Sequence, residues 1–164
     1  MKGCERTPRT AAVLAGIGLI LVGAAAQAAT RRVAPERLEH YWILSNRAEL
    51  TADAPISGKN LDKPSCAAVS YTIGSDGATY DLKLERVVPQ GDLGKVALSM
   101  VGNMRYAFAP ANLAREPVRT YLVVPFNLPR APAGASSAAQ AQVQAERDRI
   151  GAACRLPGFG APAG

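Results

Sequence analysis

The chain has 164 residues, with 19 Lys plus Arg against 13 Asp plus Glu, which gives a formal net charge of +6. Hydrophobic residues make up 48% of the chain, but aromatic residues only 5%. This composition excludes a disordered polyelectrolyte, a collagen-like chain and a multi-pass membrane protein. The length allows one ordinary domain, or a small domain with flanking segments, and leaves little room for an elaborate active-site pocket.

A secretory signal pattern occupies residues 1–28. Three basic residues and one acid precede an uncharged, apolar stretch that is centred on residues 13–22. The stretch ends in Ala26-Gln27-Ala28, a small-x-small pattern that suits signal peptidase. The alternative is an uncleaved membrane anchor, since an uncharged stretch of about twenty residues is just long enough to span a bilayer. In both cases we expect the rest of the chain to be exported.

Removal of residues 1–28 leaves a mildly basic chain with two cysteines, Cys66 and Cys154. An even pair of cysteines in an oxidising compartment predicts one disulfide. Two free thiols remain the alternative, because the sequence does not show whether the two residues are close. The basic residues do not interleave with aromatic residues, so a nucleic-acid-binding function has little support.

Alternating side chains predict a β-hairpin over residues 69–85. The first strand has Val69, Tyr71 and Ile73 on one face, and the second strand alternates apolar with charged residues over 80–85. Between the two strands, Asp76-Gly77 supplies the positive-φ position that a tight turn requires.

A helix and a third strand follow the predicted hairpin. Asp92 is the predicted N-cap of an amphipathic helix, whose apolar side consists of Leu93, Val96, Ala97, Met100, Val101 and Met104. Apolar residues then alternate over 118–126, and Pro125 and Pro129 favour an edge position for this strand. The order strand-strand-helix-strand predicts an α+β fold, with a small three-stranded antiparallel or mixed sheet and the helix packed on one face. The crossover favours a sheet in which the second and third strands flank the first and run parallel to each other.

The chain therefore divides into a signal peptide or N-terminal anchor (1–28), an N-terminal flanking segment (29–64), a central domain (65–129) and an Ala/Pro/Gly-rich tail (130–164). The tail contains a possible helix over Ala138–Ala153, with Ser136 or Ser137 as its cap. A domain of about sixty residues is marginally stable by itself. We therefore expect the aromatic segment around Trp42 and the tethered tail to complete the core.

Several short motifs follow one another over residues 65–128: Val69-Ser70-Tyr71-Thr72-Ile73, Asp76-Gly77, the helix Leu93–Met104, its exit Arg105-Tyr106-Ala107-Phe108-Ala109-Pro110, then Pro117-Val118-Arg119 and Val124-Pro125-Phe126. In their order and spacing they resemble the TonB C-terminal domain family. Each motif alone is weak, and the resemblance covers over a third of the chain.

The resemblance implies a periplasmic, non-enzymatic binding module without a cofactor. Such a module engages TonB-dependent outer-membrane transporters in energy-coupled transport, by adding a segment of the transporter as a strand to its sheet edge. The predicted edge strand supplies the candidate partner-binding residues Val118, Arg119, Thr120, Tyr121, Leu122, Val123 and Val124. Inner-membrane motor proteins are further partners if the N-terminus is an anchor. The apolar stretch contains no His and no Pro-rich linker follows it, so motor coupling has the weakest support.

Two other functions stay open. The same edge can pair with a second copy of the chain, which would make the protein a homodimeric structural or interaction protein of the envelope. A small secreted enzyme or inhibitor would need a site that the sequence does not reveal, because His40 is the only histidine and no nucleophile motif, C-x-x-C or phosphate-binding loop is present. We expect no catalytic residue, no metal ion, and neither a nucleic acid nor a small-molecule substrate as partner.

Overall fold

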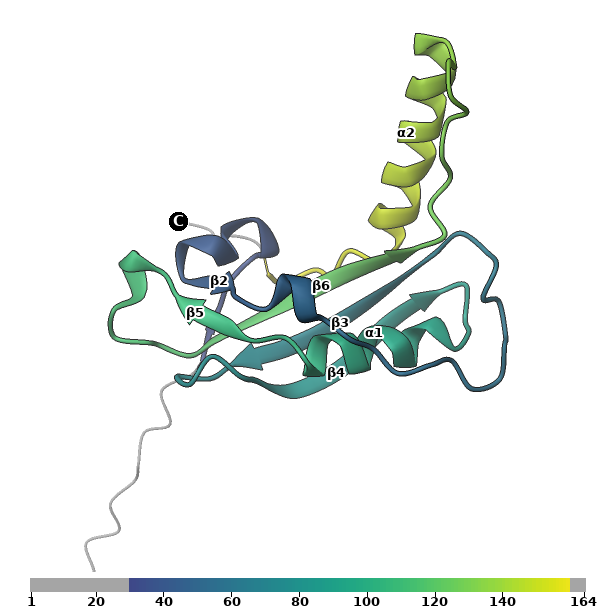
Figure 1. Ribbon diagram of the computed structural model, residues 1–164. Helices are drawn as coiled ribbons and strands as arrows, with labels where there is room; N and C mark the ends of the chain where they lie inside the picture. The colour runs from purple at the N-terminus through teal and green to yellow at the C-terminus, as the bar shows by residue number, and fades with distance from the viewer. Residues whose placement is uncertain (1–29, 160–164) are drawn as a thin grey trace, which may run out of the picture.

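The computed structural model describes residues 30–159, so the predicted signal over residues 1–28 lies outside the described part (Figure 1). The elements in chain order are β1 (Arg31–Arg32), the 3-10 helix η1 (Pro35–His40), β2 (Trp42–Leu44), η2 (Arg47–Glu49), β3 (Ser65–Ile73), β4 (Thr79–Val88), α1 (Leu93–Gly102), β5 (Tyr106–Phe108), η3 (Pro110–Asn112), β6 (Val118–Phe126) and α2 (Ser137–Ala153). Among these residues, none of the helices has the length and apolarity to cross a membrane.

The main sheet has four strands in the order β1-β6-β3-β4. Strand β3 pairs antiparallel with both β4 and β6, so these two strands flank it and run parallel to each other, as the crossover predicted. The α+β class is confirmed. The predicted three-stranded sheet has one additional strand, β1, which pairs in parallel with the start of β6. With only two residues, β1 is too short to produce a periodic pattern in the sequence.

The turn between β3 and β4 depends on Gly77. Its φ of +78° lies in the left-handed region, as the Asp-Gly pair predicted. A Cβ atom at this position would lie 2.0 Å from the carbonyl oxygen of Tyr106. The Tyr106 N–H in turn donates to the Gly77 carbonyl over 2.8 Å, so the turn also anchors the start of β5.

Helix α1 covers one face of the sheet and forms the main core with it (Figure 1). The core contains Val69, Tyr71 and Ile73 from β3 and the helix residues Ala97 and Val101, all with an exposed fraction of 1% or less. The helix ends at Gly102, two residues before the predicted last apolar position, Met104, which is nevertheless buried in the same core.

Asp92 occupies the N-cap position of α1, but its side chain does not bond a helix N–H. Its carboxylate instead accepts hydrogen bonds from the Ser57 hydroxyl (2.7 Å), the Gly58 N–H (2.9 Å) and the Ser57 N–H. The predicted capping bond is therefore wrong, because the loop before β3 competes for the same oxygens. These bonds hold the pKa of Asp92 below its usual value, with the Ser57 hydroxyl as the main cause.

The N-terminal flank completes the core, as expected. Trp42 of β2 is 1% exposed, and its indole Nε1 donates to the Glu116 carbonyl over 3.1 Å. Strand β2 pairs antiparallel with β5, which occupies the residues that the sequence suggested as a helix exit. These two short strands form a second small sheet beside the main one.

The C-terminal tail covers part of the opposite face of the main sheet. Cys66 of β3 and Cys154 form the predicted disulfide, and both are buried together with Ala68. Around them pack Val123 of β6 and the tail residues Ile150, Ala153 and Leu156. Beyond Leu156, the ring of Phe159 lies 5.0 Å from that of Tyr121.

Helix α2 itself stands away from the sheet, and only its C-terminal end reaches the disulfide region (Figure 1). The helix is capped by Ser136, whose Oγ accepts from the Ala139 N–H over 3.3 Å. None of its residues is buried. The disulfide is therefore the main covalent constraint on where this helix lies.

Candidate partner-binding edge

The outer side of β6 is occupied only at its beginning. There β1 pairs with it, with Arg31 opposite Val118 and Arg32 opposite Arg119. The Val33 N–H donates to the Arg119 carbonyl over 2.9 Å, and the Thr120 hydroxyl donates to the Val33 carbonyl over 2.8 Å. Of the seven predicted edge residues, the first three are therefore engaged by the chain's own N-terminal segment.

The stretch of β6 from Tyr121 onward has no strand partner on its outer side within residues 30–159. In an antiparallel pair, the backbone groups of successive residues point alternately toward the partner strand and away from it. The Arg119 carbonyl points away from β3, since it bonds Val33 on the outer side. The N–H and C=O groups of Tyr121 and Val123 therefore point outward as well.

Pro125 follows the same alternation and lies opposite Cys66 of β3. Its missing N–H falls on the outer side, so the ladder between β3 and β6 loses no hydrogen bond. Proline is therefore tolerated here for the predicted reason, but the predicted edge position is wrong for the start of β6, where β1 is the outer strand. The outward groups that remain are those of Tyr121 and Val123 and the carbonyl of Pro125.

Two hollows lie along this free stretch, and we call them together the β6 groove. The first has a volume of about 310 Å³ and is lined by β6, the start of η1 and the end of α2, through Pro35, Glu36, Tyr121, Leu122, Val123, Arg147, Asp148, Gly151 and Arg155. The second has a volume of about 630 Å³ and is lined by Pro125, Asn127, Leu128, Arg130 and Arg147. The two hollows share Arg147, so the groove follows the free edge past the end of the strand.

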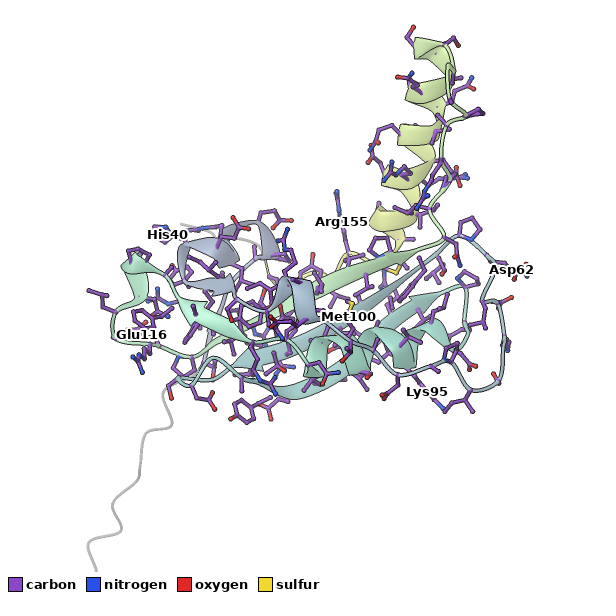
Figure 2. The ribbon with its side chains drawn as sticks, in the orientation of Figure 1. His40, Asp62, Lys95, Met100, Glu116 and Arg155 are labelled. Carbon is purple, nitrogen blue, oxygen red and sulfur yellow. A yellow bond between two sulfur atoms is a disulfide. The ribbon has the colours of Figure 1, made fainter. Side chains whose placement is uncertain are left out.

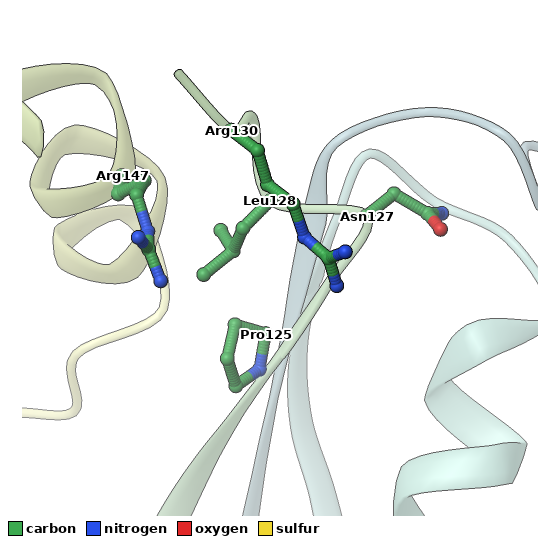
Figure 3. A pocket seen from close by; sticks show the side chains of 5 residues that line it. All are labelled: Pro125, Asn127, Leu128, Arg130 and Arg147. Atoms are coloured by element: carbon green, nitrogen blue, oxygen red, sulfur yellow. The ribbon is translucent and has the colours of Figure 1, made fainter. Parts of the chain in front are cut away.

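Charge is distributed unevenly along the β6 groove. The hollow beside Tyr121–Val123 has two arginines, Arg147 and Arg155, and two carboxylates, Glu36 and Asp148. The hollow beside Pro125 has Arg130 and Arg147 and no carboxylate. Figure 3 shows Arg147 projecting from α2 on one side and Arg130 on the other, with Leu128 between them and Pro125 below.

The other edge of the main sheet is strand β4, which has no outer partner in the described part of the chain. Its pairing with β3 has two irregularities, where β4 has more residues than its partner, and Asp81 has a φ of +51°. Most of its side chains are exposed, and Asp81, Lys83, Glu85 and Arg86 are charged. Bulges and charges of this kind prevent strands from adding to an edge. Strand β6, in contrast, pairs with β3 in a continuous register without such irregularities.

The histidine and the two buried tyrosines contact other aromatic side chains. His40 ends η1, and its ring lies edge-on to that of Tyr41, 5.4 Å away. The hydroxyl groups of Tyr71 and Tyr106 lie 2.7 Å apart in the core, and burial raises the pKa of both. Within residues 30–159, no three His, Cys, Asp or Glu side chains gather in a way that could hold a metal ion.

Two parts of this site were not predicted from the sequence. They are the position of β1 beside β6, and the position of Arg130, Arg147 and Arg155 as neighbours of β6. Arg147 and Arg155 come from the tail, and they reach the edge because the disulfide holds the end of α2 beside the sheet. The predicted disulfide, taken together with the charged block at residues 146–149, was the signal that could have found them.

Comparisons with known proteins give a distant likeness among solved structures. No family model matches the chain, and no curated protein matches it. Among solved structures, the solution NMR structure of the Pseudomonas aeruginosa TonB CTD matches with a TM-score of 0.34 and 18% sequence identity. The match covers 51% of this chain and 87% of that one.

Proposed function

We propose that this protein is a non-enzymatic, TonB-like binding module of the periplasm that accepts an extended segment of an outer-membrane transporter as an added strand beside β6. The observation that carries the proposal is the outer side of β6 from Tyr121 to Pro125, where backbone donors and acceptors point outward and no strand of residues 30–159 lies opposite. Main-chain hydrogen bonds to such an edge supply affinity, and side-chain contacts beside it supply selectivity.

The edge is short, and its two ends are defined. Toward the N-terminus of β6, strand β1 and the bond from Val33 to Arg119 already use the outward groups. Toward the C-terminus, Pro125 offers only a carbonyl. A partner therefore needs about five residues in extended conformation, which span roughly 17 Å at the rise of a β-strand. This length suits a peptide segment better than the edge of another folded domain.

The test uses the alternation of β6. In Val123→Pro, the substitution removes an outward N–H and leaves the ladder to β3 intact, as Pro125 already does at the equivalent position. In the matched control Val123→Ala, the N–H remains and the side chain is shortened. Binding of the mature, disulfide-bonded protein to fluorescent peptides from the periplasmic segments of outer-membrane transporters is measured by polarisation, and the fold is checked by circular dichroism.

We expect Val123→Pro to weaken binding at least tenfold, and Val123→Ala to retain binding within about threefold, because a lost ladder bond removes both affinity and register. Equal binding by a folded Val123→Pro variant would reject strand addition at β6. Sedimentation of the free protein at micromolar concentration tests the homodimer, which would bury the same edge and compete with the peptide.

A further inference from the structure

The end of the β6 groove beside Pro125 has an excess of positive charge with no partner. Within residues 30–159, the ion pairs are Lys83 with Glu85 and Arg149 with Glu146, and neither includes Arg130 or Arg147. Neither guanidinium donates to a carboxylate in the described part of the chain. Both come from segments that follow β6, and both line one hollow, with Leu128 between them (Figure 3).

From this arrangement, we infer that the hollow lined by Arg130 and Arg147 is a carboxylate-binding site, and that it binds a carboxylate at one end of the segment added to β6. The inference rests on the proposed function, because the free edge brings the segment to the hollow. Two planar guanidinium groups with five N–H donors each are well suited to hold carboxylate oxygens. The neighbouring hollow has equal numbers of arginines and carboxylates, so it carries no comparable preference.

The position of the site makes the inference specific. The hollow begins at Pro125, where the outward backbone donors end, and continues to Leu128 and Arg130. A carboxylate is therefore recognised only at the end of the segment that lies beside Pro125, and not in the part that pairs with Tyr121 and Val123. The carboxylate can belong to an acidic side chain or to the free C-terminus of a peptide, since both present the same two oxygens.

The disulfide is part of this site because it positions one of the two arginines. Arg147 belongs to α2, whose C-terminal end packs, through Ile150 and Ala153, on the buried region around Cys66 and Cys154. The guanidinium of Arg86 on β4 also holds the end of α2, by donating to the Ala153 carbonyl over 3.1 Å. The C-terminal tail thus adds selectivity for a carboxylate to the strand edge.

The experiment compares synthetic peptides with one Thr-Val-Thr-Val-Thr core. One has Glu-Asp before the core, one has Glu-Asp after it, one has Gln-Asn at both ends with an amidated C-terminus, and one differs from the last only by a free C-terminal carboxylate. Binding to the disulfide-bonded mature protein is measured at 20 mM and 300 mM salt. The double variant Arg130→Gln/Arg147→Gln is compared with Lys59→Gln/Lys95→Gln, which removes the same charge from another region. Lys95 lies on α1, away from Arg155 and α2 in Figure 2, and the Lys59 carbonyl accepts from the Asp92 N–H at the start of α1.

We expect one of the carboxylate-bearing peptides to bind about three- to tenfold more tightly than the amidated Gln-Asn peptide at 20 mM salt, and the advantage to shrink at 300 mM. The arginine variant should abolish the advantage, so that carboxylate-bearing and neutral peptides bind equally to it, while the lysine control should keep the advantage. Which peptide gains identifies the source of the carboxylate and the direction of the added strand.

Equal binding of all peptides, with the expected loss in Val123→Pro, would overturn the carboxylate site and leave strand addition standing. Failure of every peptide to bind would overturn both. Vesicles of phosphatidylcholine with phosphatidylglycerol test an anionic membrane surface: if the arginine variant loses vesicle binding and keeps the peptide preference, the two arginines serve lipid contact and the inference is wrong.

Discussion

Removal of the disulfide gives the sharpest test of how the tail is held. In Cys66→Ala/Cys154→Ala, small apolar side chains replace the two buried sulfur atoms, and the bond across a sequence separation of 88 residues is lost. The loop-entropy relation for a closed loop of this length gives about 4.5 kcal/mol of lost stability. With a urea m-value of about 2 kcal/mol/M, the unfolding midpoint should fall by about 2 M.

The chain provides two independent optical signals for this measurement. Trp42 is the only tryptophan and lies in the core on the α1 face, so its fluorescence reports unfolding of the sheet and α1. Circular dichroism at 222 nm reports both helices, including α2, which has no buried residue of its own. We expect part of the dichroism signal of the variant to be lost at lower urea than the fluorescence signal, because α2 is marginal once it is untethered.

A midpoint shift below about 0.5 M would refute the loop-entropy reasoning. Coincident fluorescence and dichroism transitions in the variant would show that packing of Ile150, Ala153 and Leu156 is enough to hold the helix. Addition of a reductant to the double variant is the control, and it should change neither transition.

Four further predictions follow from the packing, the titrating groups and the disulfide. Gly94→Ala should destabilise the protein by about 1–3 kcal/mol, because the new Cβ would lie 2.6 Å from a Val87 methyl. In Gly102→Ala, in the same helix, the nearest neighbour of the new Cβ lies at 3.5 Å, so this variant should be stabilised by about 0.4–1 kcal/mol, and urea unfolding compares the two. The lowered pKa of Asp92 stabilises the protein above the ordinary carboxyl pKa, and this contribution is lost as the pH falls through the folded-state value, so the Tm of the wild type should fall below about pH 4 more steeply than that of Asp92→Asn. The two core tyrosines have raised pKa values, so absorbance at 295 nm should show them ionising only when the protein unfolds above about pH 10, and their ionisation in the folded state would contradict their burial. Reduction of the disulfide should remove the carboxylate preference while neutral peptides still bind, and a preference that survives reduction would show that the tether does not position the arginine.

The periodic elements of this fold could be predicted from the sequence because the spacing of their apolar side chains shows which side of each element is buried. Strand β3 directs its larger apolar side chains into the main core and its small ones to the opposite face, and β6 and α1 also have apolar residues at regular intervals, so alternation or helical spacing was sufficient to find them. Strand β1 has only two residues, which are too few to show a periodic pattern. Its pairing with β6 depends on the path of the chain in the assembled fold. Asp92 was placed correctly at the start of α1, but its bonding partners come from a loop 35 residues earlier, which no local pattern reveals.

The candidate site was predictable only in part for the same reason. Strand β6 was recognisable from its own sequence, and the disulfide followed from the cysteine count. The extent of the free edge depends on β1, and the charge beside it depends on where the tether places Arg147. Both are consequences of contacts between segments distant in sequence, so they emerge only from the assembled fold.

The contrast between the two sheet edges also determines how many strands can assemble. A segment added to β6 becomes the new outermost strand on that side, while the bulged and charged β4 closes the other side. The sheet therefore terminates a ladder of strands and does not propagate one. Copies of the chain should therefore not polymerise edge to edge, and sedimentation should show no species larger than a dimer even at concentrations where an open two-edged sheet would polymerise.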